Sequence, residues 1–254
     1  MARSAGSVAA KERSAGSVAA KERSAGTVAV VVLIDVQRAS RLWAWSRLVL
    51  GRWPLRAVPG LRFAKVLGSG QGGGFGLAPS GTHRGLFLGF DDEAAAMDFV
   101  EHSDVLEGYR SRAREMLVTV LRACSSKGSW AGSAMSCTAT APQSGPIVAL
   151  TRASIQPRHA LAFWRMSPAA EASLVTAPGC LLAAGLGEAP LLRQATFSLW
   201  IDAAAMDRYA RSGAHQQAIR AAYAAHGGGF FSESMFVRFV PLLLRGTWQG
   251  QHHG

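Results

Sequence analysis

Two stretches of the sequence decide the fold: FLGFDDEAAAMDFV at residues 87–100 and FSLWIDAAAMDRYA at residues 197–210. Each stretch reads as an apolar strand, an aspartate where a helix N-cap belongs (Asp91 or Asp92, and Asp202), and an alanine-rich helix. The shared Ala-Ala-Ala-Met segments begin at Ala94 and Ala203. The match indicates that the chain contains two copies of one structural unit.

The repeat extends in both directions from these stretches. Upstream, Val58-Pro-Gly60 matches Ala177-Pro-Gly179, and downstream, Ser129-Trp-Ala-Gly132 matches Thr247-Trp-Gln-Gly250. Each copy predicts the element order β-α-β-β-α-β, which is the ferredoxin-like unit. We therefore predict an α+β fold of two tandem ferredoxin-like repeats, packed sheet against sheet as a fused dimeric α+β barrel.

The expected boundaries follow from the repeat. The predicted units span residues 27–132 and 146–250, joined by a linker at 133–145. The predicted strands cover residues 28–35, 61–67, 85–90 and 117–122 in the first unit, and 147–154, 180–186, 194–200 and 236–244 in the second. Tryptophan-containing helices are predicted at 41–50 and 160–166.

Residues 1–26 differ from the rest of the chain. SAGSVAAKER at residues 4–13 recurs letter for letter at 14–23. Such a run of small residues buries too little apolar surface to form a core, so we predict a disordered tail and assign it no function.

Composition restricts the function classes. Hydrophobic residues make up 49% of the chain, and no apolar run is long enough to span a membrane as a helix. Three cysteines (Cys124, Cys137 and Cys180) form no CxxC pair, which favours reduced thiols in a cytoplasmic protein. The net charge of +11 comes with no nucleic-acid motif, so an anionic membrane surface or an acidic protein partner is favoured over nucleic acid.

One histidine stands out against the repeat. His215 follows a Ser-Gly break and shares a predicted helix face with Ala218, Ile219 and Ala222. Its equivalent in the first copy is Leu106. Taken alone, His215 is either a hydrogen-bonded core histidine or a ligand. The difference between the two copies favours a single working pocket in the second unit.

The sequence resembles the spheroidene monooxygenase (carotenoid 2-ketolase) family over roughly residues 38–250. The resemblance is carried by several segments in order: Arg41-Leu-Trp43, Pro59-Gly60, the loop Gly68-Ser-Gly70 to Gly74-Phe75, Gly145-Pro-Ile-Val-Ala-Leu-Thr-Arg152, Phe163-Trp164, Gly187-Glu188-Ala-Pro190, Gln194-Ala-Thr-Phe-Ser198, Arg211-Ser-Gly-Ala-His215, Phe231-Ser-Glu233 and Gly246-Thr-Trp-Gln-Gly250.

The resemblance implies a haem-dependent monooxygenase that takes electrons from ferredoxin. It would introduce a keto group at C2 of an acyclic, spheroidene-like carotenoid through two successive hydroxylations. His215 is then the expected iron ligand, with the Cys180 thiolate as an alternative. Glu233 is expected to accept a hydrogen bond from the second ring nitrogen of His215. Gln194 and Arg152 are expected near the bound dioxygen, and Glu188 either lines the pocket or ends a loop.

Two other readings remain open at this point. One is a cofactor-free α+β-barrel oxygenase that acts on a polyketide-like substrate with His215 as the base. The other is a carrier of haem or of a lipophilic molecule, without catalysis. An oligomer is compatible with all three readings.

Residues 41–56 carry three tryptophans (Trp43, Trp45 and Trp53) and four arginines. The pattern is typical of a helix lying on an anionic lipid surface, which would place the protein at the periphery of the inner membrane. The alternative is a core helix whose tryptophans pack on the sheet. The glycine-rich stretch 68–76 lacks a Lys-Ser/Thr ending, so we predict a flexible connection there and no phosphate loop.

Overall fold

The computed structural model of the chain describes residues 23–76, 78–189, 192–211 and 229–253. The first unit contains β2 (Val28–Val36), α1 (Arg41–Leu50), α2 (Arg52–Leu55), β3 (Leu61–Gly70), β4 (Pro79–Phe90), α3 (Glu93–His102), α4 (Asp104–Arg110) and β5 (Ala113–Gly128). The second unit contains β7 (Ile147–Ile155), α5 (Ala160–Val175), β8 (Cys180–Ala189), β9 (Arg193–Trp200), α6 (Ala203–Ala210) and β10 (Phe231–Trp248). The remaining described elements are short: the 3₁₀ helices η1 (Arg38–Ser40), η2 (Gln71–Gly73) and η3 (Pro157–His159), and the strands β1 (Arg23–Ser24), β6 (Ser133–Ala134) and β11 (Gln251–His253).

The predicted fold class is confirmed. The strand order is β5-β2-β4-β3 in the first unit and β10-β7-β9-β8 in the second, so both units have the ferredoxin-like topology. The helix starts also behave as predicted, because Asp92 and Asp202 cap α3 and α6. Each carboxylate accepts a hydrogen bond from a backbone N–H in the first turn, at 2.9 Å and 2.7 Å respectively.

Strand registers confirm the internal repeat residue by residue. Phe87 on β4 pairs with Val31 on β2, and Phe197 on β9 pairs with Leu150 on β7. Because Val31 and Leu150 are equivalent in the sequence repeat, the two sheets are built in the same register.

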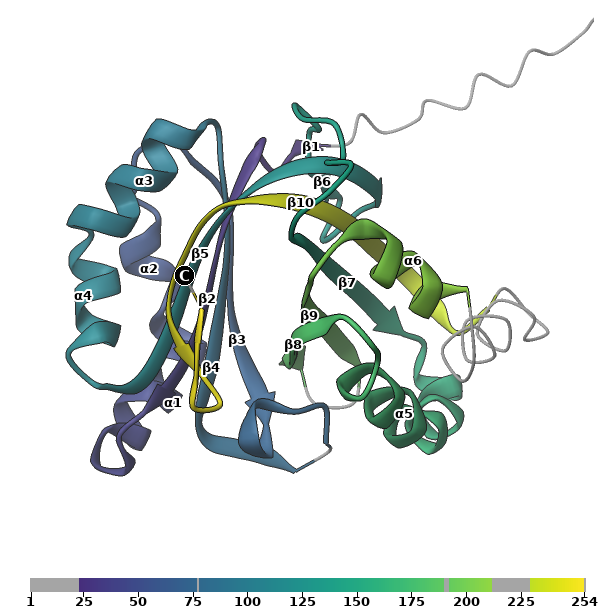
Figure 1. Ribbon diagram of the computed structural model, residues 1–254. Coiled ribbons are helices and arrows are strands. Elements are labelled where there is room, and N and C mark those ends of the chain that lie inside the picture. The colour runs from purple at the N-terminus through teal and green to yellow at the C-terminus, as the bar shows by residue number, and fades with distance from the viewer. Residues whose placement is uncertain (1–22, 77, 190–191, 212–228, 254) are drawn as a thin grey trace, which may run out of the picture.

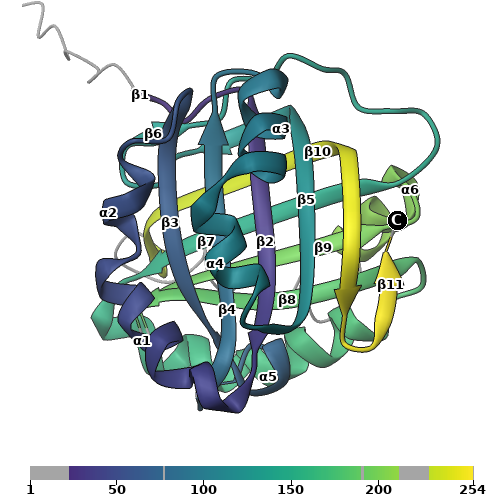
Figure 2. The same cartoon turned by 90° about the vertical axis from the view of Figure 1, so that its left-hand side faces the viewer.

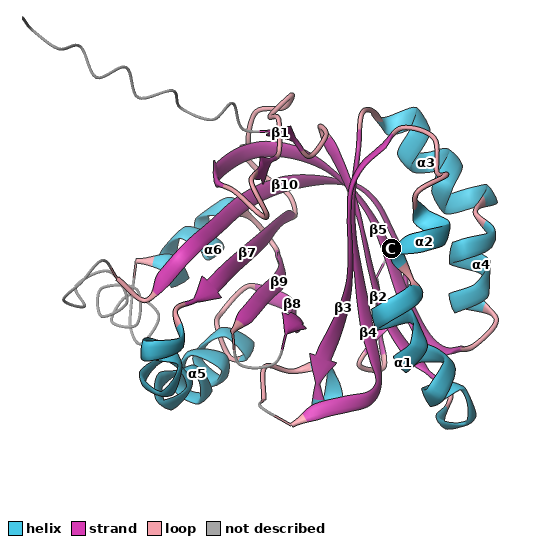
Figure 3. Ribbon diagram, turned by 180° about the vertical axis from the view of Figure 1, so that it is seen from behind, coloured by secondary structure: helices cyan, strands magenta, loops and turns pink. Residues whose placement is uncertain are grey.

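The two sheets join into a closed barrel through two unequal seams (Figures 1 and 3). One seam is long, since β10 pairs with β5 from Met235 opposite Gly128 to Gly246 opposite Leu117. The other seam is a single pair, Gly68 on β3 opposite Gly187 on β8. The β3–β8 seam is therefore the place where backbone hydrogen bonding contributes least to closure.

Apolar side chains form three layers. The barrel interior is filled from both sheets by residues such as Val31, Phe87, Leu150 and Phe197. Helices α1 to α4 cover the outer face of the first sheet (Figure 2), and α5 and α6 flank the second sheet (Figure 1). The chain alternates inward and outward side chains along each strand, so both faces of each sheet have their own contacts.

The element boundaries differ from the predicted ones at several ends. Before β2, β1 pairs with β6, and Ala25 is buried against the barrel. A Cβ atom on Gly89 would lie 1.9 Å from the carbonyl oxygen of Ala25, so only glycine allows this approach. Most strands run longer than predicted, and α5 continues to Val175. Residues 1–22 lie outside the described part.

Within the described ranges, no helix is both long enough and apolar enough to cross a membrane.

Candidate functional site

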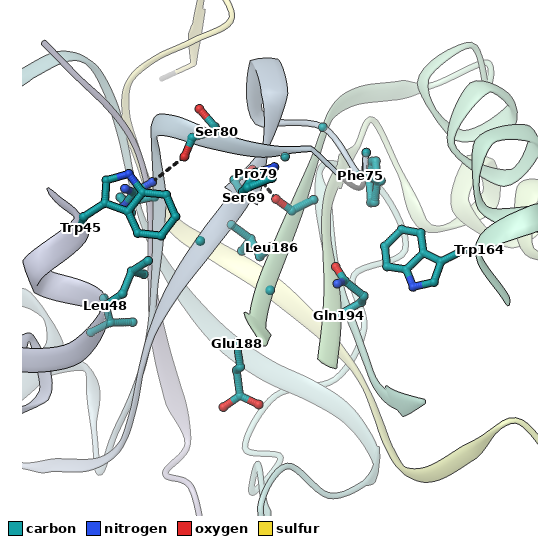
Figure 4. Close-up of a pocket in the computed structure, with 18 residues that line it drawn as sticks. Trp45, Leu48, Ser69, Phe75, Pro79, Ser80, Trp164, Leu186, Glu188 and Gln194 are labelled. Carbon is teal, nitrogen blue, oxygen red and sulfur yellow. Dashed lines mark hydrogen bonds between the residues drawn. The ribbon is translucent and has the colours of Figure 1, made fainter. Parts of the chain in front are cut away.

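A cavity of about 150 Å³ lies at the β3–β8 seam and is lined by residues of both units (Figure 4). Trp45 and Leu48 of α1 form one wall. Phe75, from the loop after η2, and Trp164 of α5 form the opposite wall. The walls are apolar and largely aromatic, so the cavity suits a hydrophobic ligand.

Glycines line the cavity where the loop after η2 approaches the backbone of β8. A Cβ atom on Gly185 would lie 2.4 Å from the carbonyl oxygen of Gly74. The loop that carries Gly74 therefore packs directly on β8, and the backbone N–H of Phe75 donates to Glu171 Oε1 on α5 at 3.2 Å. The glycine-rich stretch is thus an anchored bridge from the first unit to the second.

Arg84 holds in place the part of α1 that forms one wall of the cavity. It is buried on β4, and its Nε donates to the carbonyl of Ala44 on α1 at 3.1 Å. Its guanidinium lies 4.9 Å from the ring centroid of Trp45. A buried charged group is stable only when such partners are present, so Arg84 ties the position of α1 to the sheet.

The outer faces of the two sheets differ in the size of their side chains. On the first sheet they are Val30, Val32, Ile34, Leu86 and Leu88, and at the equivalent positions of the second sheet they are Ala149, Thr151, Ala153, Thr196 and Ser198. Val32 is 0% exposed, whereas its equivalent Thr151 is exposed. Within the described residues, the outer face of the second sheet therefore has free space at positions where the outer face of the first sheet is covered by helices.

Gln194, on β9, lies where the outer face of the second sheet borders the cavity. It is one of the cavity-lining residues, and a Cβ atom on Gly187 would lie 3.4 Å from its Oε1. The amide thus extends over a glycine that leaves it room. Gln194 can both donate and accept a hydrogen bond at this position.

A chain of charged side chains lies on the opposite, inner face of the second sheet. Arg152 is 3% exposed and forms ion pairs with Glu233 and, at 3.3 Å, with Glu188. Glu188 also pairs with Lys65 on β3. Because Lys65 and Glu188 stand on either side of the short seam, their ion pair links β3 to β8 where the backbone makes a single pair.

The ring of Trp130 lies beside this charged chain. The Lys65 ammonium is 5.7 Å and the Arg152 guanidinium 5.6 Å from its centroid. Both distances fall within the range of cation–π attraction.

The neighbouring charges and hydrogen bonds lower the pKa values of both carboxylates, Glu188 and Glu233. Burial by itself would raise the pKa of Glu188, but the hydrogen bond and charge of Lys65 and the charge of Arg152 outweigh it and bring that pKa below its ordinary value. For Glu233, burial is likewise outweighed by the backbone N–H groups of Gly132 and Ala131, the Ser129 hydroxyl and Arg152, so its pKa is also lowered. Both groups are therefore fitted to accept hydrogen bonds at neutral pH.

The structure brings some of the predicted site residues together and separates others. Arg152 and Glu233 are in contact, and Glu188 lines the cavity. Gln194 pairs with Ala153, next to Arg152, but successive strand residues point to opposite faces. Gln194 therefore faces outward and Arg152 inward. His215 lies outside the described residues, and its first-unit equivalent Leu106 is fully buried on α4. The catalytic and ligand roles remain predictions.

The sequence did not predict a role for Lys65, nor the place of Trp45 and Trp164 in the cavity wall. The repeat contains a signal for Lys65, because its equivalent in the second unit is Ala184. A charged residue that replaces an apolar one in an otherwise matching strand marks a special environment. Trp45 and Trp164 carry no such signal, since each lies on a helix with several aromatic residues.

Metal-binding side chains are sparse in the described ranges. Among them, no group of three or more His, Cys, Asp or Glu side chains is arranged to hold a metal ion. Cys180, the alternative haem ligand, is half-buried, and burial raises its pKa to about 11. Its thiol is therefore protonated near neutral pH, which disfavours a thiolate ligand.

The chain is similar in sequence to curated bacterial proteins. It is 53% identical over 225 residues to a spheroidene monooxygenase of Rubrivivax gelatinosus, covering 89% of this chain and 86% of the relative. It is 37% identical over 217 residues to a spheroidene monooxygenase of Rhodobacter capsulatus, covering 84% of this chain and 89% of the relative. No family model matches the chain.

Solved structures share the fold at low identity. Aldoxime dehydratase aligns with a TM-score of 0.55 at 10% identity, covering 89% of this chain and 88% of that chain. Another aldoxime dehydratase, in complex with butyraldoxime, aligns with a TM-score of 0.57 at 10% identity, covering 87% and 82%. These likenesses support the fused barrel alone. The sequence relationship goes further, because it spans most of both proteins: the chain belongs to the spheroidene monooxygenase family.

Proposed function

We propose that this monooxygenase acts on an acyclic carotenoid, requires haem, and takes its electrons from reduced ferredoxin. The observation that carries the substrate class is the 53% identity, over most of both chains, to a relative named spheroidene monooxygenase. The apolar walls of the cavity at the β3–β8 seam agree with a polyene ligand. The proposed product is the C2 ketone.

The residues around the second sheet fit a flat, largely apolar group such as haem. The outer face carries small side chains, including Ala149, Thr151 and Ala153, where the first unit carries larger ones. The proposed iron ligand is His215, which lies outside the described residues. When bound, haem would activate dioxygen with electrons from the donor protein.

The residues of this chain would bind and orient the substrate. Trp45, Leu48, Phe75 and Trp164 would contact the polyene and exclude water from the reacting carbon. A cavity of about 150 Å³ corresponds to roughly five water volumes, so it would hold one end of the polyene and not its whole length. The amide of Gln194 would donate a hydrogen bond to an oxygen atom at the boundary between the cavity and the second sheet.

The proposed reaction is two hydroxylations of the same carbon. Each step replaces one C–H bond by C–O–H and consumes one dioxygen, two electrons and two protons, releasing one water. The second step yields a geminal diol, which loses water to give the ketone. Buried Arg152, paired with Glu188 and Glu233, would have a positioning role on the inner face of the sheet.

An absorption spectrum and a product mass test this proposal. Purified protein supplied with haem should show a Soret band, and His215→Ala should lose it, whereas His102→Ala, which changes an exposed histidine of α3, should keep it. With reduced ferredoxin and an acyclic carotenoid, the product should be heavier by the replacement of two hydrogens by one oxygen. The absence of a Soret band in wild-type protein would contradict the haem requirement, and an unchanged carotenoid would contradict the substrate.

A further inference from the structure

The positive charge of the folded part is concentrated in one segment. Residues 36–90 contain eight Lys or Arg residues and no Asp or Glu. Three of the eight are held by the fold, since Arg62 pairs with Asp91, Lys65 pairs with Glu188, and Arg84 is buried against backbone carbonyls. The other five lie on η1 (Arg38), α1 (Arg41 and Arg47) and α2 (Arg52), or directly after α2 (Arg56).

The same segment exposes large apolar side chains. Leu42 is 77% exposed, Val49 80% and Trp53 70%. Leu42, Trp45 and Val49 follow the spacing i, i+3 and i+7, so they form one stripe along α1. Isolated exposed apolar residues are ordinary, but a continuous stripe bordered by arginines marks an interaction surface.

Packing of α1 on the sheet accounts for only some of its apolar side chains. Ala44 is buried, and Trp43 packs edge-on against Tyr109 at a centroid distance of 5.0 Å. This side of the helix is satisfied by the protein. Leu42 and Val49 lie on another side of α1 and remain exposed, as does Trp53 on α2. The helix therefore has one face packed on the sheet and one apolar face exposed to solvent.

The exposed stripe is continuous with the cavity. Trp45 belongs to both, because it is 44% exposed and also lines the cavity wall. Across the cavity, Leu161 on α5 is 67% exposed and precedes the lining residue Trp164 by three positions. Helices α1 and α5 lie at the same end of the barrel (Figures 1 and 2). The cavity thus opens at the end where these apolar side chains are exposed.

We propose that η1, α1 and α2 form a docking surface for an anionic lipid bilayer. Leu42, Val49 and Trp53 would insert among the lipids, and the exposed arginines would contact acidic headgroups. A helix with an apolar stripe, basic borders and no acidic residue has the composition of an interfacial helix. That the surface also delivers a lipid-soluble ligand to the cavity rests on the proposed function. The docking itself does not.

Vesicle flotation of the full chain tests the docking surface. Wild-type protein should float with phosphatidylcholine vesicles that contain phosphatidylglycerol at about one part in three, and much less with phosphatidylcholine alone. Arg41→Gln combined with Arg52→Gln should weaken binding about thirtyfold. Val49→Ser combined with Trp53→Ser should weaken it at least about tenfold. The matched control is Val175→Ser, an exposed apolar residue at the far end of α5, which should bind as wild type.

Three results would overturn the docking surface: no flotation with the anionic vesicles, equal flotation with both vesicle types, or wild-type binding by both double variants. A change from dimer to monomer in the Val49/Trp53 variant, seen by light scattering, together with no vesicle binding, would instead assign the surface to a second copy of the chain. Soret absorbance and turnover of detergent-dispersed carotenoid, measured on the same variants, should be unchanged. Failure of the haem or turnover assay in wild-type protein would count against the proposed function and leave the docking result standing.

Discussion

Glu115 and Glu233 stand at equivalent positions of the two units, and each carboxylate holds the Trp-x-Gly turn of the other unit. Glu115 accepts hydrogen bonds from the backbone N–H groups of Gln249 and Gly250, at 2.9 Å and 2.7 Å. Glu233 accepts one from the backbone N–H of Gly132 at 3.0 Å. The two units therefore exchange carboxylate caps across the long β5–β10 seam.

The capped turns have the same backbone strain. Ala131 and Gln249 both adopt φ of 53°, in the left-handed region that non-glycine residues rarely occupy. A carboxylate that accepts the turn's N–H groups stabilises this conformation. Glu233 therefore has a structural task that it shares with Glu115, in addition to its ion pair with Arg152.

We predict that both caps contribute to stability, and unequally. Glu115→Ala should lower the free energy of unfolding by about 1–3 kcal/mol, because it leaves backbone N–H groups without an acceptor. Glu233→Ala should cost about 3 kcal/mol or more, because it also removes a partner of buried Arg152. Urea denaturation of the two variants measures the difference, and equal losses would contradict the contribution of the ion pair.

The same two positions test the catalytic role predicted for Glu233. Glu233→Gln and Glu115→Gln both keep a hydrogen-bond acceptor at the turn. If Glu233 takes part in catalysis, turnover at low temperature should fall in the first variant and stay near wild type in the second. Equal turnover in both would restrict Glu233 to the structural task.

The ion pair across the short seam predicts a pH dependence of stability. The pKa of Glu188 in the folded protein lies below its ordinary value of 4.5. Its contribution is therefore fully present above that value and is lost as the pH falls through the folded pKa, because the unfolded chain then binds more protons. Glu188→Gln should flatten the stability profile below about pH 5. Urea titrations across this range measure it, and Glu107→Gln, in an exposed ion pair of α4, should leave the slope unchanged.

The small side chains of the second sheet can be exchanged for those of the first. Thr151→Val with Thr196→Leu would give the second sheet the first unit's side chains, and we expect the protein to fold with unchanged or higher stability. Haem binding, followed by the Soret band, should fall because the space is filled. The reciprocal change Val32→Thr should cost about 1–3 kcal/mol, since it buries a hydroxyl in a packed layer. Unchanged haem binding in the double variant would move the haem site away from this face.

Two glycines at the seam make a matched pair. Gly185→Ala should displace the loop that carries Gly74, because the new Cβ would lie 2.4 Å from the Gly74 carbonyl oxygen. Gly68→Ala should be tolerated, because its nearest neighbour, the Gly187 carbonyl oxygen, is 3.8 Å away. Thermal unfolding and proteolysis within residues 70–76 compare the two, and equal behaviour would contradict close packing of the loop on β8.

Much of the fold followed from local sequence signals. The strands β2 and β7 begin where the valine- and isoleucine-rich runs begin, α1 has the predicted bounds, and Asp92 and Asp202 cap their helices. Each of these depends on residues within a few positions of one another. The internal repeat then supplied the topology, because two copies of a ferredoxin-like unit have one common way to close a barrel.

The candidate site depended on tertiary structure. Lys65 and Glu188 meet because β3 and β8 are neighbours in the closed barrel, and no local pattern encodes that pairing. Gln194 and Arg152 were predicted to work together, but strand register places them on opposite faces. The helix α1 shows the same division. Its sequence determined an amphipathic, arginine-rich helix, whereas only the packed structure decided that Trp43 faces the core and Val49 faces outward, because that depends on how the helix is rotated against the sheet.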